Sequence, residues 1–344
     1  MNASNSTYDS FCSIKESYES LVEVVFLTVA FLLVTFGISA NIFVVVLAAR
    51  YTARKNLHHL IVNMAMADLL MVITSSSMWF PYLFSYNILE KVELTVATYV
   101  CKAVSLIGSS SVLASLLTLL IISVERFRVT RLTVQRSRPY TLKRRIVVLS
   151  CSWLFPLVII GYRSYTARVQ STGHTLLCDY EDGNRSLFYL LYYIFALIIL
   201  FVSITLNILT LRRLTKPRAI ESSLSEAERQ ARVRRTAKVV KMVMSSLILY
   251  ALCYIPFYLL NVTIYIDATI FGTNYNCLEW KIMYFVLPFF LPLCNSCFSP
   301  CMYIIFLSDF REAASRLVCR RTVSRLAKNR RKSVVEPQQM ETVM

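Results

Sequence analysis

Seven long apolar stretches follow one another along the chain, with shorter polar stretches between them. They cover residues 21–49, 57–83, 99–124, 146–162, 187–211, 239–266 and 278–307. A helix needs about 20 apolar residues to cross about 30 Å of hydrocarbon, and each stretch meets or approaches this length. Backbone groups in lipid must form hydrogen bonds within their own segment, and the strands of a membrane barrel would be about half as long. The pattern therefore predicts an all-α membrane protein, a bundle of seven transmembrane helices.

Composition and charge support this class and set an orientation. The chain is 56% hydrophobic and only 17% charged, whereas soluble domains carry about 25% charged residues. Thirty of the 37 Lys and Arg residues fall on one side of the predicted membrane, which the positive-inside rule makes the cytoplasmic side. The N-terminus is then outside. The net charge of +17 is explained by this topology and by anionic lipid, so no nucleic acid partner is expected.

This topology divides the chain into four parts. Residues 1–20 form an extracellular arm, 21–307 the transmembrane domain, 308–319 an amphipathic eighth helix on the inner surface, and 320–344 a disordered cytoplasmic tail. Asn2 and Asn5 begin glycosylation triplets on the arm. The last three residues, "TVM", fit a ligand of a PDZ domain. Both patterns are short and also occur by chance.

A charged pair, Glu125 and Arg126, ends the third apolar stretch. Cys101 lies 25 residues earlier, which corresponds to about 38 Å of helix. Cys101 is therefore expected at the outer surface and the charged pair just beyond the inner one. Such a pair is either an anchor at the membrane edge or part of a switch whose geometry depends on helix packing.

Other unusual residues lie inside the apolar stretches. Asp68 falls in mid-membrane, where an isolated carboxylate costs several kcal/mol unless it is paired or hydrated. Pro256 interrupts the sixth stretch and predicts a kink. The seventh stretch ends in "SPCMY", which contains Pro300 and Tyr303.

Eight features taken together resemble the rhodopsin-like family of G-protein-coupled receptors over almost the whole chain. In chain order, they are Asn41, Asp68, Cys101, the "ERF" triplet at 125–127, Trp153, Cys178, Pro256 and the segment 300–303. Each falls on the matching helix or loop of the family's pattern. The resemblance implies a receptor with a seven-helix bundle.

The resemblance assigns a role to the charged pair. It implies that Glu125 restrains Arg126 at rest, and that Arg126 meets a heterotrimeric G protein when the sixth helix swings outward. Tyr303 belongs to the same coupling switch, and arrestin is a further expected partner on the inner side. The residues expected to form the activation switch are Tyr254, Pro256, Ser299 and Pro300.

The chain departs from the family's pattern at several of these positions. Tyr254 stands in place of the usual tryptophan and Ser299 in place of the usual asparagine. The sixth helix often begins with an acid that clasps the arginine, but this chain has Thr236 there. The resting state is therefore expected to be held less tightly, with measurable basal activity.

The resemblance also implies a sodium ion held by Asp68, Ser115, Asn295 and Ser299. A hard cation prefers one carboxylate together with neutral oxygens. The alternative is a protonated Asp68 that hydrogen-bonds to Asn295, Ser296 or water. No other cofactor is expected.

Cysteines on the outer side lie in an oxidising compartment. Cys12, Cys101, Cys178 and Cys277 are on that side, and four cysteines allow three pairings. The resemblance implies a bridge between Cys101 and Cys178, which leaves Cys12 for Cys277. Cys319 ends the amphipathic segment and suits palmitoylation, with a free surface thiol as the alternative.

The ligand is predicted mainly from absences. Amine receptors of this family place an aspartate where this chain has Gly108, and opsins need a lysine near Leu293, where this chain has none. Gly108 and Ser109 leave room at the centre of the pocket. The residues expected to line it are Gly108, Ser109, Val112, Phe257, Tyr258, Asn261 and Phe289, although any of them could instead serve ordinary helix packing.

The outer loops and arm carry 11 acids against seven bases, which favours a cationic ligand through long-range steering. A peptide is therefore the favoured ligand. A small non-peptide ligand and a constitutively active receptor without a ligand remain alternatives.

Two other classes of function are less well supported by the sequence. A transporter or channel would need several ionisable residues along a path through the membrane, and Asp68 is nearly alone there. An enzyme would need a metal cluster, a nucleophile with its base, or a phosphate loop, and none is recognisable.

The departure at Thr236 generates a prediction. Thr236→Glu would restore an acid near Arg126, so we expect it to lower ligand-free signalling. The measurement compares both proteins in cells at equal surface expression. Unchanged signalling would contradict the idea of a weakened resting state.

Overall fold

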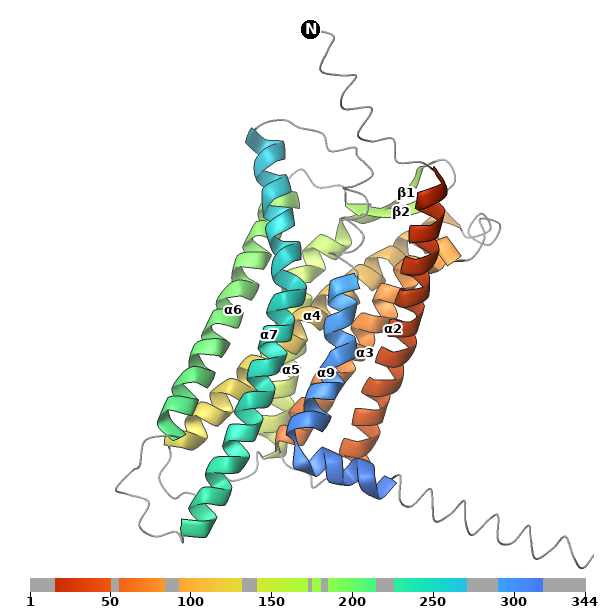
Figure 1. The fold of residues 1–344 in the computed structure, drawn as a ribbon. Helices are drawn as coiled ribbons and strands as arrows, with labels where there is room; N and C mark the ends of the chain where they lie inside the picture. Colours follow the sequence, from red (N-terminus) through yellow and green to blue (C-terminus); the bar gives the residue numbers. More distant parts are fainter. Residues whose placement is uncertain are drawn as a thin grey trace, which may run out of the picture.

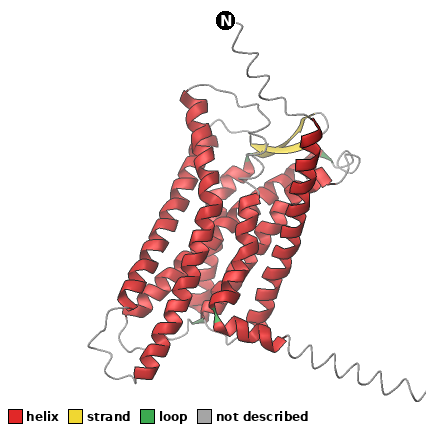
Figure 2. Cartoon of the chain, in the orientation of Figure 1, coloured by secondary structure: helices red, strands yellow, loops and turns green. Residues whose placement is uncertain are grey.

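The computed structural model describes residues 16–50, 56–83, 93–131, 141–172, 175–180, 185–214, 226–270 and 290–317. Its long helices run antiparallel to their chain neighbours as a bundle (Figure 1). They are α2 (Glu16–Arg50), α3 (Asn56–Leu83), α4 (Leu94–Arg131), α5 (Leu142–Tyr165), α6 (Arg185–Leu214), α7 (Glu226–Ile270) and α9 (Leu291–Phe306). A further helix, Ser308–Leu317, bends away from α9 by 95°. Figure 2 shows how completely helices dominate the fold.

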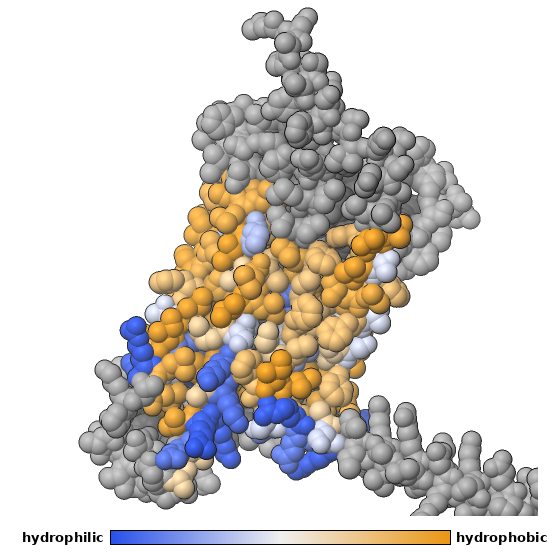
Figure 3. Space-filling view, in the orientation of Figure 1, coloured by the Kyte–Doolittle hydropathy of each residue, from blue (hydrophilic) through white to orange (hydrophobic). Residues whose placement is uncertain are grey.

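The outer surface of the bundle suits a membrane. Six helices are long and apolar enough to cross one, and α9 with the bent helix after it makes a seventh candidate span. Large apolar side chains face outward along the bundle; Val158 is 77% exposed and Phe201 is 72% exposed. Figure 3 shows apolar side chains across the middle of one face and polar side chains at one end. The predicted seven-helix membrane bundle is confirmed.

We call the end of the bundle that carries Arg126 and Arg213 the basic end. The opposite end carries a hairpin that the sequence pattern did not predict. Its strands β1 (Ala167–Thr172) and β2 (Thr175–Tyr180) pair antiparallel, with Val169 opposite Cys178. β1 contacts α4.

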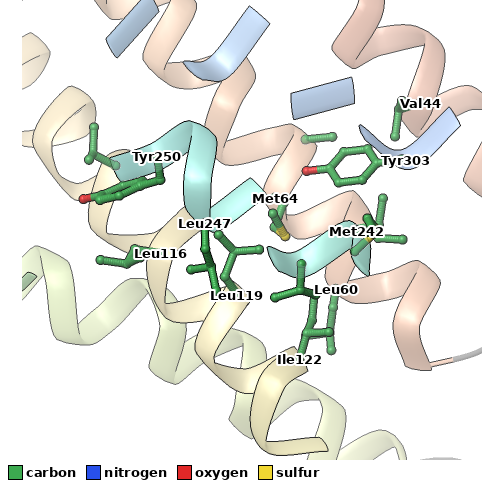
Figure 4. Packing of buried hydrophobic residues seen from close by; sticks show 14 of the residues in the cluster. Val44, Leu60, Met64, Leu116, Leu119, Ile122, Met242, Leu247, Tyr250 and Tyr303 are labelled. Carbon is green, nitrogen blue, oxygen red and sulfur yellow. The ribbon is translucent and has the colours of Figure 1, made fainter. Parts of the chain in front are cut away.

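α4 is the central helix, because it contacts α3, α5, α6 and α7 as well as β1. The main apolar core lies between the helices, and Figure 4 shows part of it. It includes Leu60 and Met64 of α3, Leu116, Leu119 and Ile122 of α4, Met242 and Leu247 of α7, and Tyr303 of α9. Lipid tails are as apolar as these side chains, so their close packing, rather than the hydrophobic effect, favours helix association.

Polar side chains join α3, α4 and α5 around Asn63, which belongs to α3. Asn63 donates hydrogen bonds to the hydroxyl groups of Thr118 on α4, at 2.8 Å, and Ser152 on α5, at 3.2 Å. The Trp153 indole N–H donates to the Asn63 side-chain oxygen at 2.9 Å. All the polar atoms of the amide are therefore used, which fixes how α3, α4 and α5 are rotated against one another.

The helices extend beyond the apolar stretches that predicted them. α2 begins at Glu16, before residue 21, and α7 begins at Glu226 in a charged segment, well before residue 239. Hydropathy marks only the part of a helix that lies in lipid, so polar extensions escape it. The seventh apolar stretch is described from residue 290 onward.

The helices α2 and α9 approach closely at Gly37. A Cβ atom on Gly37 would lie 2.6 Å from the Cys297 sulfur and 3.1 Å from a Val72 methyl group. The Cys297 thiol also donates to the carbonyl oxygen of Leu33 at 3.0 Å. The contact requires glycine because no other residue leaves room for the thiol.

We therefore expect Gly37→Ala to lower the free energy of unfolding by about 1–3 kcal/mol, the usual cost of overpacking. Cys297→Ala in the same chain should recover part of this loss. Gly161→Ala is the matched control, since a Cβ atom there would meet nothing within 4 Å. Thermal unfolding of the purified proteins in detergent measures all three variants and the parent. Equal effects of the two glycine substitutions would contradict the explanation.

Candidate functional site

The charged pair lies at the basic end of α4. A guanidinium nitrogen of Arg126 (Nη2) is 3.6 Å from a carboxylate oxygen of Glu125 (Oε1), and their side chains are only 17% and 12% exposed. In the part of the chain that the structure describes, the Nε of Arg126 and the other oxygen of Glu125 are buried without a hydrogen-bond partner. The pair is therefore loose and incompletely satisfied, and buried charges in that condition are costly.

Two contacts hold α6 against α4 beside this pair. The side-chain NH2 group of Asn207 donates to the Ser123 hydroxyl oxygen at 2.7 Å, and both residues are fully buried. The guanidinium of Arg213 lies 4.0 Å from the centre of the Phe127 ring. Neither Asn207 nor Arg213 was predicted to act at the switch. The sequence could have indicated Asn207, because an asparagine inside an apolar stretch is a buried amide that needs a partner on another helix.

Contact between α7 and α4 near the switch is mainly apolar. Thr236, where an acid was expected from the family's pattern, is 6% exposed. Among the described residues, Glu125 is the only acid within ion-pair distance of Arg126. The side chains that meet between these helices include Leu119, Met242 and Leu247. An apolar contact can be separated without breaking an ion pair.

Tyr303 is fully buried near the end of α9, in the same cluster as Met64 and Met242 (Figure 4). Within the described residues, its hydroxyl oxygen has no hydrogen-bond partner. A buried hydroxyl without a partner costs about 1–3 kcal/mol. A second arrangement that gives this hydroxyl a partner would avoid this cost and would to that extent be stabilised relative to the present one.

Asp68 lies near the middle of α3 and is 1% exposed. The hydroxyl groups of Ser115 and Ser296 donate to one of its oxygens at 3.4 Å and 3.5 Å. The other carboxylate oxygen is buried and has no partner among the described residues. These hydrogen bonds are long, so the carboxylate is surrounded by oxygens but weakly satisfied.

The remaining residues of this polar site are on α9. Asn295 and Ser299 are both buried, and the Ser299 hydroxyl donates to the carbonyl oxygen of Asn295 at 2.8 Å. The Ser299 side chain lies close to Asp68. Ser296, one of the alternative partners expected for a protonated Asp68, does donate to the carboxylate, at 3.5 Å. The described residues contain no group of three or more His, Cys, Asp or Glu side chains that could hold a metal ion.

The predicted pocket differs in part from the structure. A Cβ atom on Gly108 would lie 2.9 Å from the Thr74 hydroxyl oxygen, so Thr74 occupies space that was expected to be open. Val112 and Tyr258 are buried, and Ser109 and Phe257 are partly buried. The side chains of Asn261 and Phe289 lie outside the described residues.

The activation-switch residues lie on two helices. Tyr254 and Pro256 are inside α7, where Tyr254 is 3% exposed. Ser299 and Pro300 are buried inside α9. Tyr254 stacks on Tyr250, with ring centres 4.3 Å apart. The sequence pattern did not indicate Tyr250, because a tyrosine in an apolar stretch reads as one more large apolar residue.

The other predicted sites are described only in part. Cys101 is buried and disulfide-bonded. Cys178 belongs to β2, in the hairpin that contacts α4. Its pairing with Cys101 stays a prediction. The remaining modification and disulfide sites, Asn2, Asn5, Cys12, Cys277 and Cys319, lie outside the described residues.

Comparison with known proteins identifies the family. The chain matches the profile described as "7 transmembrane receptor (rhodopsin family)" over residues 40–303. This match covers most of the chain and includes the charged pair, the Asp68 site and Tyr303. The chain therefore belongs to the rhodopsin family of seven-transmembrane receptors. It is a multi-pass membrane receptor and not an enzyme.

Individual relatives are distant but align over most of their length. "Probable G-protein coupled receptor 34" of Mus musculus is 25% identical, over 95% of this chain and 84% of that receptor. The "Pyroglutamylated RF-amide peptide receptor" of Mus musculus is 24% identical, over 84% of this chain and 68% of that receptor. "Somatostatin receptor type 2" of Mus musculus is 24% identical, over 88% of this chain and 79% of that receptor.

Proposed function

We propose that the chain is a plasma-membrane receptor that converts binding of an extracellular ligand into activation of a heterotrimeric G protein. The N-terminus is then extracellular and the basic end faces the cytoplasm. The observation that carries this proposal is the loose pair of Glu125 and Arg126 at the basic end. Its buried, partnerless atoms favour a second arrangement in which Arg126 meets another protein.

The mechanism follows from what holds α7 in place. The contact between α7 and α4 is apolar and includes Leu119, Met242 and Leu247. Outward movement of the basic end of α7 would uncover this apolar surface together with Arg126. A G protein that covers both would stabilise the moved state, as any partner stabilises the state it binds. Arrestin is proposed for the same surface, and a PDZ-domain protein for the C-terminus.

A cationic peptide is the proposed ligand. The acidic excess of the predicted outer segments supports a cationic ligand, and one aligned relative is named as a peptide receptor. A receptor active without a ligand is the second candidate. It is favoured by the incomplete satisfaction of Glu125 and Arg126.

The proposed coupling to a G protein generates a prediction. Cells that express the chain should respond to at least one member of a panel of basic, amidated peptides, read as calcium or cyclic AMP. Arg126→Ala should remove most of that response, because it removes the proposed G-protein contact. Arg128→Ala is the matched control, since Arg128 is an exposed arginine on the same helix.

The panel also contains amines, nucleosides and lipids, which separates the alternatives. A response to these compounds alone would keep the receptor and exclude the peptide. Ligand-free signalling that Arg126→Ala abolishes would support the second candidate. Equal responses of the parent and Arg126→Ala at matched surface expression would contradict the proposed coupling site.

We also propose that Asp68 holds a sodium ion. The donor set fits, because a buried carboxylate with one partnerless oxygen lies among the hydroxyl groups of Ser115, Ser296 and Ser299. A hard monovalent cation would compensate the buried charge, and these neutral oxygens would coordinate it. The ion would thereby stabilise the resting packing of α3, α4 and α9.

The corresponding prediction uses thermal stability. Raising sodium chloride from zero to about 0.5 M should raise Tm by roughly a few degrees, because an ion that binds only the folded state stabilises it. Potassium chloride at equal ionic strength is the control for screening. Asp68→Asn should abolish the difference between the two salts. An equal response of Asp68→Asn and the parent to sodium would contradict the site.

A further inference from the structure

Three tyrosines lie on one face of α7 at intervals of four residues. Tyr250, Tyr254 and Tyr258 are each 3% exposed or less. Residues four apart on a helix are neighbours on its surface, so the three side chains form one row. Pro256 lies within the row, between Tyr254 and Tyr258.

The rings of this row form a continuous stack that reaches a second helix. Tyr250 and Tyr254 have ring centres 4.3 Å apart and an interplanar angle of 26°. Tyr254 and Tyr258 follow at 5.9 Å. Tyr193 of α6 stacks on Tyr258 at 4.6 Å with an angle of 25°. Offset or tilted aromatic contacts at such distances are each worth about 0.5–1.5 kcal/mol beyond their burial.

The two ends of the row are joined by a hydrogen bond. The hydroxyl oxygens of Tyr250 and Tyr258 are 2.7 Å apart, so one hydroxyl donates to the other. Their Cα positions are eight residues apart, about 12 Å along a straight helix. Two long side chains have to converge to bridge that separation. The bond is therefore sensitive to any change in the helix between them.

Pro256 makes such a change easy at this place. Proline has no backbone N–H, so one hydrogen bond to the preceding turn is missing inside α7. The backbone resists bending less there than elsewhere in the helix. The side-chain bond from Tyr250 to Tyr258 spans this weak point and links the helix segments on its two sides.

We propose that the hydrogen bond between Tyr250 and Tyr258 is a latch that holds α7 at its present bend across Pro256. With the latch closed, Met242 and Leu247 stay in the apolar contact with α4. Opening the latch frees the basic end of α7 to move away from α4. This inference rests on the proposed function, because only a receptor that signals through α7 would report the opening as activity.

The position of Tyr258 indicates how a ligand would reach the latch. Tyr258 is the end of the row nearest the hairpin end, and its neighbour Phe257 contacts Tyr193 at 5.8 Å between ring centres. A ligand that shifts this aromatic group would draw the Tyr258 hydroxyl away from Tyr250. Tyr250 is thus a positioning residue that acts through Tyr258 and does not itself contact the ligand.

The test uses Tyr250→Phe, Tyr258→Phe and the double variant, which keep every ring and remove only hydroxyl groups. Each single variant should increase ligand-free signalling about twofold to tenfold, the equivalent of one lost hydrogen bond. The double variant should add nothing further, because both substitutions break the same bond. Tyr162→Phe is the control, since Tyr162 is 68% exposed on α5.

A second readout does not depend on a G protein. Hydrogen–deuterium exchange of the α7 segment 236–247 is measured in the purified full chain. Faster exchange in both single variants, with no further increase in the double variant, is the expected result. Unchanged exchange there would overturn the latch, whatever the signalling shows. Additive effects of the two substitutions would also overturn it.

The two readouts separate the latch from the proposed function. Faster exchange together with raised signalling supports both. Faster exchange without any signal that Arg126→Ala can lower supports the latch and contradicts the coupling proposal. Raised signalling with unchanged exchange overturns the latch while leaving the receptor function standing.

Discussion

Hydrocarbon offers no hydrogen-bond partners, so the polar groups of this chain have to find partners within the bundle. Asn63 shows how this constraint sets the architecture, because its amide joins three helices at once. Asn41 joins two helices in a similar way. Its NH2 group donates to Gly37 within α2 at 2.9 Å and to Ser296 on α9 at 3.0 Å. Helix rotation, and hence which apolar side chains meet, follows from these few polar contacts.

The same constraint makes the exceptions informative. Among the described residues, buried polar atoms without hydrogen-bond partners occur at several places, and atoms of Asn41, Ser110, Asn207, Arg213 and Ser246 are among them. Four others belong to the sites described above: Asp68, Glu125, Arg126 and Tyr303. These residues lie along the faces of α3, α4 and α9. Where the polar network is complete, the structure has little to gain from rearranging. Where it is incomplete, an ion, a partner protein or a second helix arrangement can lower the free energy. Polar groups in an incomplete network are therefore suited to form a switch.

The sequence predicted the parts of this structure that depend on single residues with unusual costs. A carboxylate, a proline and a charged pair each stand out against an apolar background. In the structure they lie inside α3, inside α7 and toward the basic end of α4. The hairpin was missed because its strands are short and lack a clear alternation. Tyr250 and the fit of Thr74 against Gly108 were also missed, since they depend on which faces of two helices meet. Hydropathy along one chain carries no information about that pairing.

The bend after α9 has a mechanical consequence. The helix Ser308–Leu317 leaves α9 at 95°, and its Asp309 carboxylate lies 3.5 Å from the His58 imidazole at the start of α3. Phe310 is buried and packs edge-on against the same ring. The short helix is therefore attached to α3 as well as to the end of α9, so a tilt of α9 would have to carry or break the contacts at His58. Because it leaves α9 at close to a right angle, this helix forms a crossbar between α9 and α3, and a displacement of either long helix is felt by the other at the basic end.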